Sequence, residues 1–153
     1  MASSVSAEAL AQPGDSLIAC SAAGCLGRVA YYDAGGVTAS TDTHVAIARP
    51  DRSHVLPEYL YRYLAGAQGQ RQLRRRERGD WQREKVGFRL IELNLRDLQR
   101  VPVPLPSLSD QEKVLQHLRE LDQRALEVHR AGAEQKARIA KLRGAVRRSV
   151  FAS

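Results

Sequence analysis

Three short apolar stretches in the first third of the chain have the pattern of β-strands. They are Ser16–Cys20, Val29–Tyr32 and Thr43–Ala48, each bounded by glycines or other turn residues. The turn Gly24–Gly27 joins the first two stretches, which predicts a β-hairpin. Residues 1–13 are small and polar, and they predict a flexible lead-in.

The spacing of the apolar residues then changes to that of a helix. Pro57 suits the first turn of this helix, and the residues that share one of its faces are Leu56, Leu60, Tyr63 and Leu64. Two outcomes are open at its end. Either Gly66 or Gly69 breaks the helix, or it continues into residues 70–76.

The next segment is predicted to return to strands. Phe88–Leu93 has strand character, and Asn94 can cap a short helix that runs to Leu98. Val101–Leu105 is predicted as a strand that carries alternate prolines. Because proline lacks the N–H that an inner strand needs, this segment is an edge strand or a stiff connector.

A long helix is predicted after the last proline. Ser109 and Glu112 have the spacing of a capping box, and no proline follows them. A helix from Asp110 to Val150 is roughly 60 Å long at about 1.5 Å per residue. The predicted fold class is therefore α+β, with a small mixed α/β body at residues 14–106 and one long helix of coiled-coil type at residues 107–153.

Apolar residues recur along that helix in steps of four and three, which is a heptad pattern. This seam is weakest at Gly132 and Gln135. Because isolated helices are marginal in water, we expect the seam to pair with a helix of a partner chain; the alternative is a lone solvated helix. The expected seam residues are Val114, Leu118, Leu121, Ala125, Val128, Ile139, Leu142 and Val146.

Four stretches, in this order along the chain, resemble the specificity (S) subunit of type I restriction–modification systems. The stretches GDSLI (residues 14–18) and GCLGR (residues 24–28) are similar to the family's G-D-x-L-I and G-x-x-G-K/R. PEYLYRYL (residues 57–64) is similar to its P-x-Y-L-x-x-x-L helix. PLPSLSDQ (residues 104–111) is similar to P-L-P-x-L-x-x-Q, which precedes a long spacer helix in the family.

The resemblance implies a non-catalytic subunit that selects double-stranded DNA for partner methyltransferase and restriction subunits. A full S subunit carries two target-recognition domains and two long helices that pair antiparallel and dock the methyltransferase. This chain resembles half of that plan, so we expect a half-length or N-terminally truncated member with a partial target-recognition domain. We expect it to form a homodimer or hetero-oligomer through the helix.

The charge of the chain is uneven in a way that favours a polyanionic partner. The net charge is +7. Residues 71–89 hold eight basic and three acidic residues (8 − 3 = +5), and residues 136–148 hold six basic residues and no acid, so the remainder carries 7 − 11 = −4. The first cluster is the expected DNA surface, and the second is expected to be structural or partner-facing. The expected DNA-binding residues are Arg71, Arg74, Arg75, Arg76, Arg78, Trp81, Arg83 and Lys85.

Motifs for catalysis or cofactor binding are not found in the sequence. Cys20 and Cys25 have no metal-ligand spacing with the four histidines, so we expect neither a metal nor another cofactor. Neither a secretory signal nor an apolar run near the ~20 residues of a membrane span is present, so a cytoplasmic protein is expected. Two other functions are open: a helix-mediated docking protein that binds no DNA, and the C-terminal recognition module of a fused DNA methyltransferase-nuclease.

Overall fold

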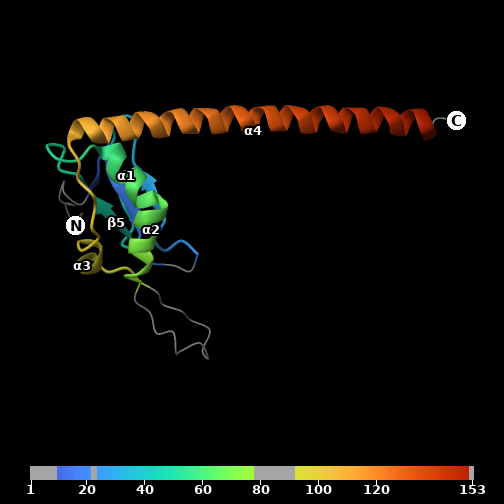
Figure 1. Ribbon diagram of the computed structural model, residues 1–153. Coiled ribbons are helices and arrows are strands. Elements are labelled where there is room, and N and C mark those ends of the chain that lie inside the picture. Colours follow the sequence, from blue (N-terminus) through green and yellow to red (C-terminus); the bar gives the residue numbers. More distant parts are fainter. Residues whose placement is uncertain (1–9, 22–23, 78–91, 152–153) are drawn as a thin grey trace, which may run out of the picture. The chain divides into compact units, whose positions relative to one another are not determined.

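The computed structural model describes residues 10–21, 24–77 and 92–151, and the side chains as far as Arg143 (Figure 1). The chain divides into two compact units, residues 1–112 and 113–153. The first unit contains small antiparallel sheets and short helices, and α4 (Leu108–Phe151) is a helix of 44 residues. The predicted α+β class with a long C-terminal helix is confirmed.

The body is organised around β2 (Ser16–Ala19), which is the middle strand of a three-stranded antiparallel sheet. It pairs with β3 (Val29–Tyr31) on one side and with β5 (Val45–Ala48) on the other. The three predicted strands and the β2–β3 hairpin are therefore confirmed. On β2, Ser16 and Ile18 are buried and alternate with half-buried residues, as expected for a strand with one face on the core.

A second sheet of two strands corrects the prediction of a flexible lead-in over residues 1–13. β1 (Leu10–Ala11) pairs with β4 (Ala39–Ser40), and Ala11 is fully buried. Asp15, which is 2% exposed, accepts hydrogen bonds from the backbone N–H of Gln12 (2.7 Å) and from two nitrogens of Arg49 (3.0 and 2.8 Å). Arg49 also donates to the carbonyl of Leu10 (2.7 Å). Residues 10–13 thus belong to the body, and residues 1–9 lie outside the described residues.

Gly66 separates two helices, α1 (Pro57–Ala65) and α2 (Ala67–Arg74). The sequence left open whether the helix ends at a glycine or continues. The first helix ends before Gly66, and a second helix begins directly after it. Gly69 is buried where α2 crosses α1, and a Cβ at this position would overlap the carbonyl oxygen of Tyr63 and the backbone of Leu64. Glycine is therefore required for the two helices to pack closely. The buried apolar residues of the body are Ala11, Ile18, Leu64, Leu73 and Leu93.

Of the two alternatives left open for Val101–Leu105, the connector is the one observed, because residues 101–107 have no ladder pairing. The prolines remove donors, and tyrosines of α1 bind the carbonyls instead. Tyr63 donates to Pro102 O (2.7 Å) and Tyr59 to Pro104 O (3.2 Å). Four residues of helix advance about 6 Å, and two residues of extended chain advance about the same distance. Two tyrosines that are four residues apart on the helix can therefore each reach a proline carbonyl on the connector, where the prolines are two residues apart.

The short helix α3 (Leu95–Leu98) confirms one prediction, and the strand expected before it cannot be followed. The side chain of Asn94 accepts a hydrogen bond from Asp97 N (2.8 Å), as expected for a helix cap. Most of the predicted strand Phe88–Leu93 lies outside the described residues.

The cap of α4 differs from the prediction by two residues. Ser107 Oγ accepts a hydrogen bond from Asp110 N (3.2 Å) and donates to the Asp110 carboxylate (2.7 Å). The predicted pair, Ser109 and Glu112, has the same Ser-x-x-acid spacing, so the sequence pattern fits both registers. The earlier register is the one in which Gln111 is buried.

Gln111 fastens the first turn of α4 to two other segments of the body. It is fully buried, and its Oε1 accepts a hydrogen bond from Leu56 N (2.9 Å). Its Nε2 donates to His54 O (2.8 Å) and to Pro106 O (2.9 Å). Leu56 is the N-cap residue of α1, and its own side chain makes no capping hydrogen bond. The side-chain oxygen of Gln111, 55 residues later in the sequence, accepts the hydrogen bond from the free backbone N–H of Leu56 instead.

We predict that Gln111→Ala lowers the free energy of unfolding by about 2–3 kcal/mol, because a fully buried side chain and its three hydrogen bonds to backbone groups are lost. Chemical denaturation in urea measures this change. Gln123→Ala is the matched control, since Gln123 is an exposed glutamine of the same helix. Equal stability of the two variants would contradict the role given to Gln111.

Candidate nucleic-acid interface

Three exposed arginines lie close together in sequence on α2 and its C-cap residue, Arg75. Leu73 and Gly69 are buried, and the helical period turns Arg71, Arg74 and Arg75 outward. All three arginines are exposed, and in the part of the chain that the structure describes their guanidinium groups have no hydrogen-bond or ion-pair partner. We call these three residues the α2 arginine surface.

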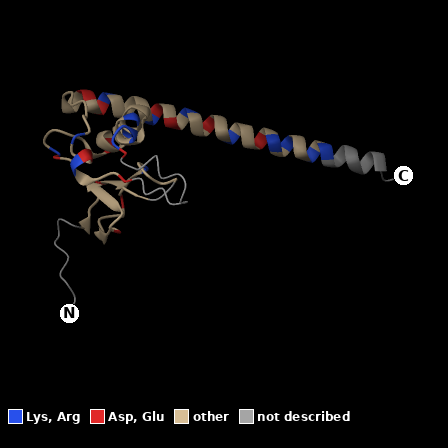
Figure 2. Cartoon of the chain, turned by 90° about the horizontal axis from the view of Figure 1, so that it is seen from below, with Lys and Arg blue, Asp and Glu red and all other residues tan. Residues whose placement is uncertain are grey.

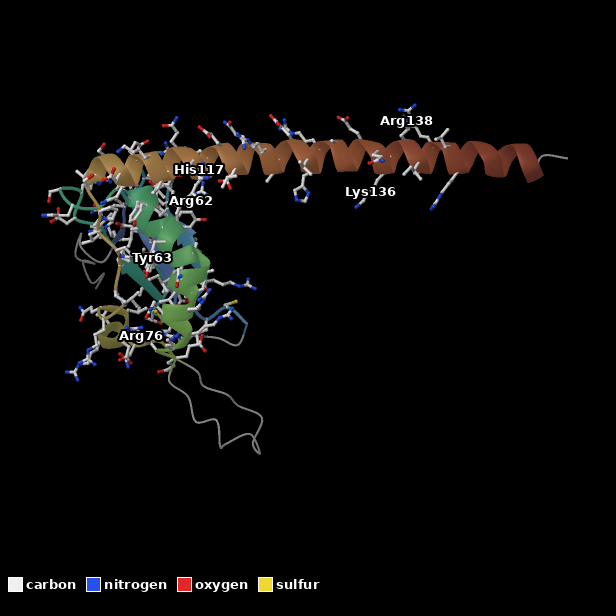
Figure 3. The ribbon with its side chains drawn as sticks, in the orientation of Figure 1. Arg62, Tyr63, Arg76, His117, Lys136 and Arg138 are labelled. Carbon is white, nitrogen blue, oxygen red and sulfur yellow. The ribbon has the colours of Figure 1, made fainter. Side chains whose placement is uncertain are left out.

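Arg76, which follows directly, has a different environment. Its Nη1 donates to the carbonyl and side-chain oxygens of Gln72, both at 2.9 Å. Its Nη2 donates to Arg100 O (2.8 Å), so it links the end of α2 to the end of α3. Arg76 lies at that end of α2 in Figure 3. The guanidinium is therefore engaged with the protein, unlike those of its neighbours.

Four of the predicted DNA-binding residues lie outside the described residues: Arg78, Trp81, Arg83 and Lys85. Their assignment stays a prediction. The structure adds exposed arginines that the sequence reasoning missed, namely Arg96 and Arg100. No local pattern could identify them, because only the Arg76 hydrogen bond brings residue 100 to the end of α2.

The turn between β2 and β3 also lies against α2. Gln70 Nε2 donates to Gly27 O (2.8 Å) and to Leu64 O (2.9 Å). Gly27 is buried, and its φ of 75° falls in the left-handed region that glycine adopts readily. This turn contains the G-x-x-G-R stretch, so the motif is a structural junction between the hairpin and the helix.

Candidate catalytic groups in the described residues are poorly equipped for chemistry. Ser21 Oγ lies 2.6 Å from His44 Nδ1 in an exposed pair. The nearby carboxylate of Asp42 accepts from the backbone N–H of His44 (3.1 Å), and this hydrogen bond, followed by the one from the Thr43 hydroxyl, lowers the pKa of Asp42. That carboxylate therefore does not orient the imidazole, which a catalytic triad requires.

The described residues also offer neither a reactive thiol nor a group of metal ligands. Burial raises the pKa of the Cys20 thiol, which opposes formation of the nucleophilic thiolate. The described residues hold no group of three His, Cys, Asp or Glu side chains that could bind a metal ion. In that part of the chain, no helix has both the length and the apolar character to cross a membrane.

The predicted seam of α4 is largely exposed. Val128 is 73% exposed and Leu142 is 59% exposed, and Val114, Leu121 and Ile139 are each above 40%. Ala125 is also exposed, and Leu118 is half-buried. The side chain of Val146 lies outside the described residues. A row of exposed apolar side chains on one helix is typical of a surface that binds another protein.

Comparison with known proteins gives a family match. The sequence pattern of the type I restriction modification DNA specificity domain matches residues 5–137. No curated protein and no solved structure matches the chain significantly.

We predict that Arg76→Ala destabilises the body, whereas Arg75→Ala does not. Loss of the bonds to Gln72 and Arg100 should cost about 1–2 kcal/mol, and truncation of an exposed side chain should stay within about 0.5 kcal/mol. Urea denaturation of the two variants measures the difference. A larger loss for Arg75→Ala than for Arg76→Ala would contradict the assignment.

Proposed function

The chain belongs to the family of type I restriction–modification DNA specificity domains, and from this membership we propose that it is a DNA-binding specificity subunit. It directs partner methyltransferase and restriction subunits to a target sequence and does no chemistry itself. In this proposal residues 14–106 form a partial target-recognition domain, and residues 107–153 form the spacer helix. The observation that carries the proposal is the family match together with the α2 arginine surface.

The α2 arginine surface suits the phosphate backbone of DNA. Arg71, Arg74 and Arg75 are presented by a helix that is fixed at three points: Gly69 on α1, Gln70 on the hairpin turn, and Arg76 on Arg100. Because the helix is held by these contacts, the backbone that carries the three arginines is in place before DNA binds, and only the side chains are ordered on binding. Each phosphate that an arginine neutralises releases counterions and makes the affinity depend on salt.

The exposed seam of α4 supports assembly through this helix. Burying apolar side chains such as Val128 and Leu142 against a second helix removes them from water. In the proposal, two copies pair along their seams and form a homodimer that presents two DNA-binding bodies. The same helices then dock the methyltransferase subunits. Such a dimer reads a divided, symmetric DNA site.

The charges along α4 favour an antiparallel arrangement of the two copies. Residues 108–134 hold four basic and six acidic residues (4 − 6 = −2), whereas residues 135–151 hold six basic residues and no acid (+6). Figure 2 shows the basic residues gathered toward the C-terminal part of the helix, and Figure 3 shows Lys136 and Arg138 on different sides of it. In a parallel pair the two C-terminal segments, each with a charge of +6, would lie side by side and repel. In an antiparallel pair each +6 segment lies beside the −2 segment of the other copy, which is electrostatically more favourable.

We predict that replacing Arg71, Arg74 and Arg75 with alanine together weakens binding to random-sequence duplex DNA. The slope of log affinity against log salt should fall in magnitude by roughly two to three, about 0.9 for each lost phosphate contact. Fluorescence anisotropy titrations at several KCl concentrations measure the slope.

The matched control for this experiment removes three exposed cations of α4: Arg130, Arg138 and Lys141. Its salt slope should remain that of the unchanged chain. If the unchanged chain shows no salt-dependent binding, the DNA-binding role is wrong and a docking protein that binds no DNA is the better account.

We predict that Leu118→Asp combined with Leu142→Asp abolishes self-association, because charge is introduced into the seam. Sedimentation velocity should give the 17.0 kDa of one chain for the variant and twice that mass for the unchanged chain. Leu126→Asp is the control, since Leu126 is 51% exposed on α4 but lies off the seam. A dimer that survives the double substitution, or an unchanged chain that is monomeric, would rule out this seam as the dimer interface.

A further inference from the structure

The turn that precedes Arg28 is bonded to α2, the helix that carries Arg71 and Arg74. Arg28 follows Gly27, whose carbonyl accepts the hydrogen bond from Gln70. On α2, Gln70 directly precedes Arg71 and lies one helical turn before Arg74, on the same side of the helix. Residue 28 and residues 71 and 74 are 43 or more positions apart in sequence, and the bond from Gln70 ties the residue before Arg28 to the helix that carries Arg71 and Arg74.

The backbone around Arg28 is fixed while its side chain is free to reach a ligand. Arg28 N donates to Cys25 O (3.0 Å), and Arg28 O accepts from Ala19 N (2.9 Å). The residue is exposed, and its guanidinium has no hydrogen-bond partner in the described segments. An arginine on a rigid turn beside other unpaired arginines adds to the local positive potential.

Gln70 is well suited to hold the turn in place. Both hydrogens of its amide are used, one for Gly27 O and one for Leu64 O. Leu64 lies in the last turn of α1, where carbonyls lack a partner within the helix. The same side chain thus satisfies the end of α1 and fixes the turn that carries Arg28. Replacement of Gln70 by alanine would remove the hydrogen bond that holds the turn to α2, and it would leave the charge of the chain unchanged.

We propose that Arg28 is a further phosphate-binding residue of the α2 arginine surface and that Gln70 is its positioning residue. This inference rests on the proposed DNA-binding function and adds to it a contact from the β2–β3 hairpin. Duplex DNA that binds α2 is therefore contacted by two elements, the helix and the hairpin turn.

The experiment is a set of anisotropy titrations of the full chain with labelled random-sequence duplex DNA at several KCl concentrations. Arg28→Ala should lower the affinity a few-fold and reduce the salt slope by about one, and Arg28→Lys should restore most of the slope. Arg130→Ala removes the same charge from an exposed site on α4 and should leave both quantities unchanged. Gln70→Ala should weaken binding more in the unchanged chain than in the Arg28→Ala background, because the part of its effect that acts through Arg28 is already lost there.

The outcomes separate this inference from the function on which it rests. If the unchanged chain binds DNA and Arg28→Ala behaves like Arg130→Ala, Arg28 is not a phosphate contact and the inference alone fails. If Gln70→Ala weakens binding equally with and without Arg28, Gln70 does not act through Arg28 and its positioning role fails. If the unchanged chain binds no DNA, the proposed function fails and this inference fails with it.

Discussion

The fully buried side chain of Gln111 holds three segments of the body together through hydrogen bonds to their backbone groups. Three segments meet there: the loop before α1, the proline connector and the first turn of α4. Each contributes a backbone N–H or carbonyl that lacks a partner in its own element, and such groups are costly to bury unpaired. Tyr59 and Tyr63 donate hydrogen bonds to two further carbonyls of the connector. The connector is thereby attached to the body by side-chain hydrogen bonds in place of the ladder bonds of a strand.

The basic run of the sequence divides into two kinds of arginine once it is placed on a helix. Arg71, Arg74 and Arg75 face away from the buried side of α2 and are available to a ligand. Arg76, one residue later, falls on the side that faces Gln72 and the end of α3, and its donors are taken. Charge alone does not distinguish them, because the distinction depends on the helical period and on a carbonyl 24 residues away.

Much of the fold could be predicted from the sequence, and the failures share one cause. Local periodicity was sufficient for β2, β3, β5, α1 and α3, because each has a clear pattern of apolar residues or a cap. β1 was missed because its partner β4 and the Arg49 bond come from distant segments. The start of α4 was misplaced because two serines offer the same capping pattern, and only the burial of Gln111 selects Ser107. For the site, the sequence pointed to the basic run that contains Arg71, Arg74 and Arg75, and DNA binding by these residues stays a prediction, whereas the contacts of Arg76 and Gln70 required the tertiary structure.

The central claim is that one chain combines a DNA-binding body with a helix that pairs two copies, so that recognition is two-fold. Selection of duplexes from a random-sequence library by the purified full chain, followed by sequencing, tests this claim most directly. The account predicts an enriched site made of two inverted half-sites at one fixed spacing. A single undivided site, or no enrichment over the starting library, would contradict it.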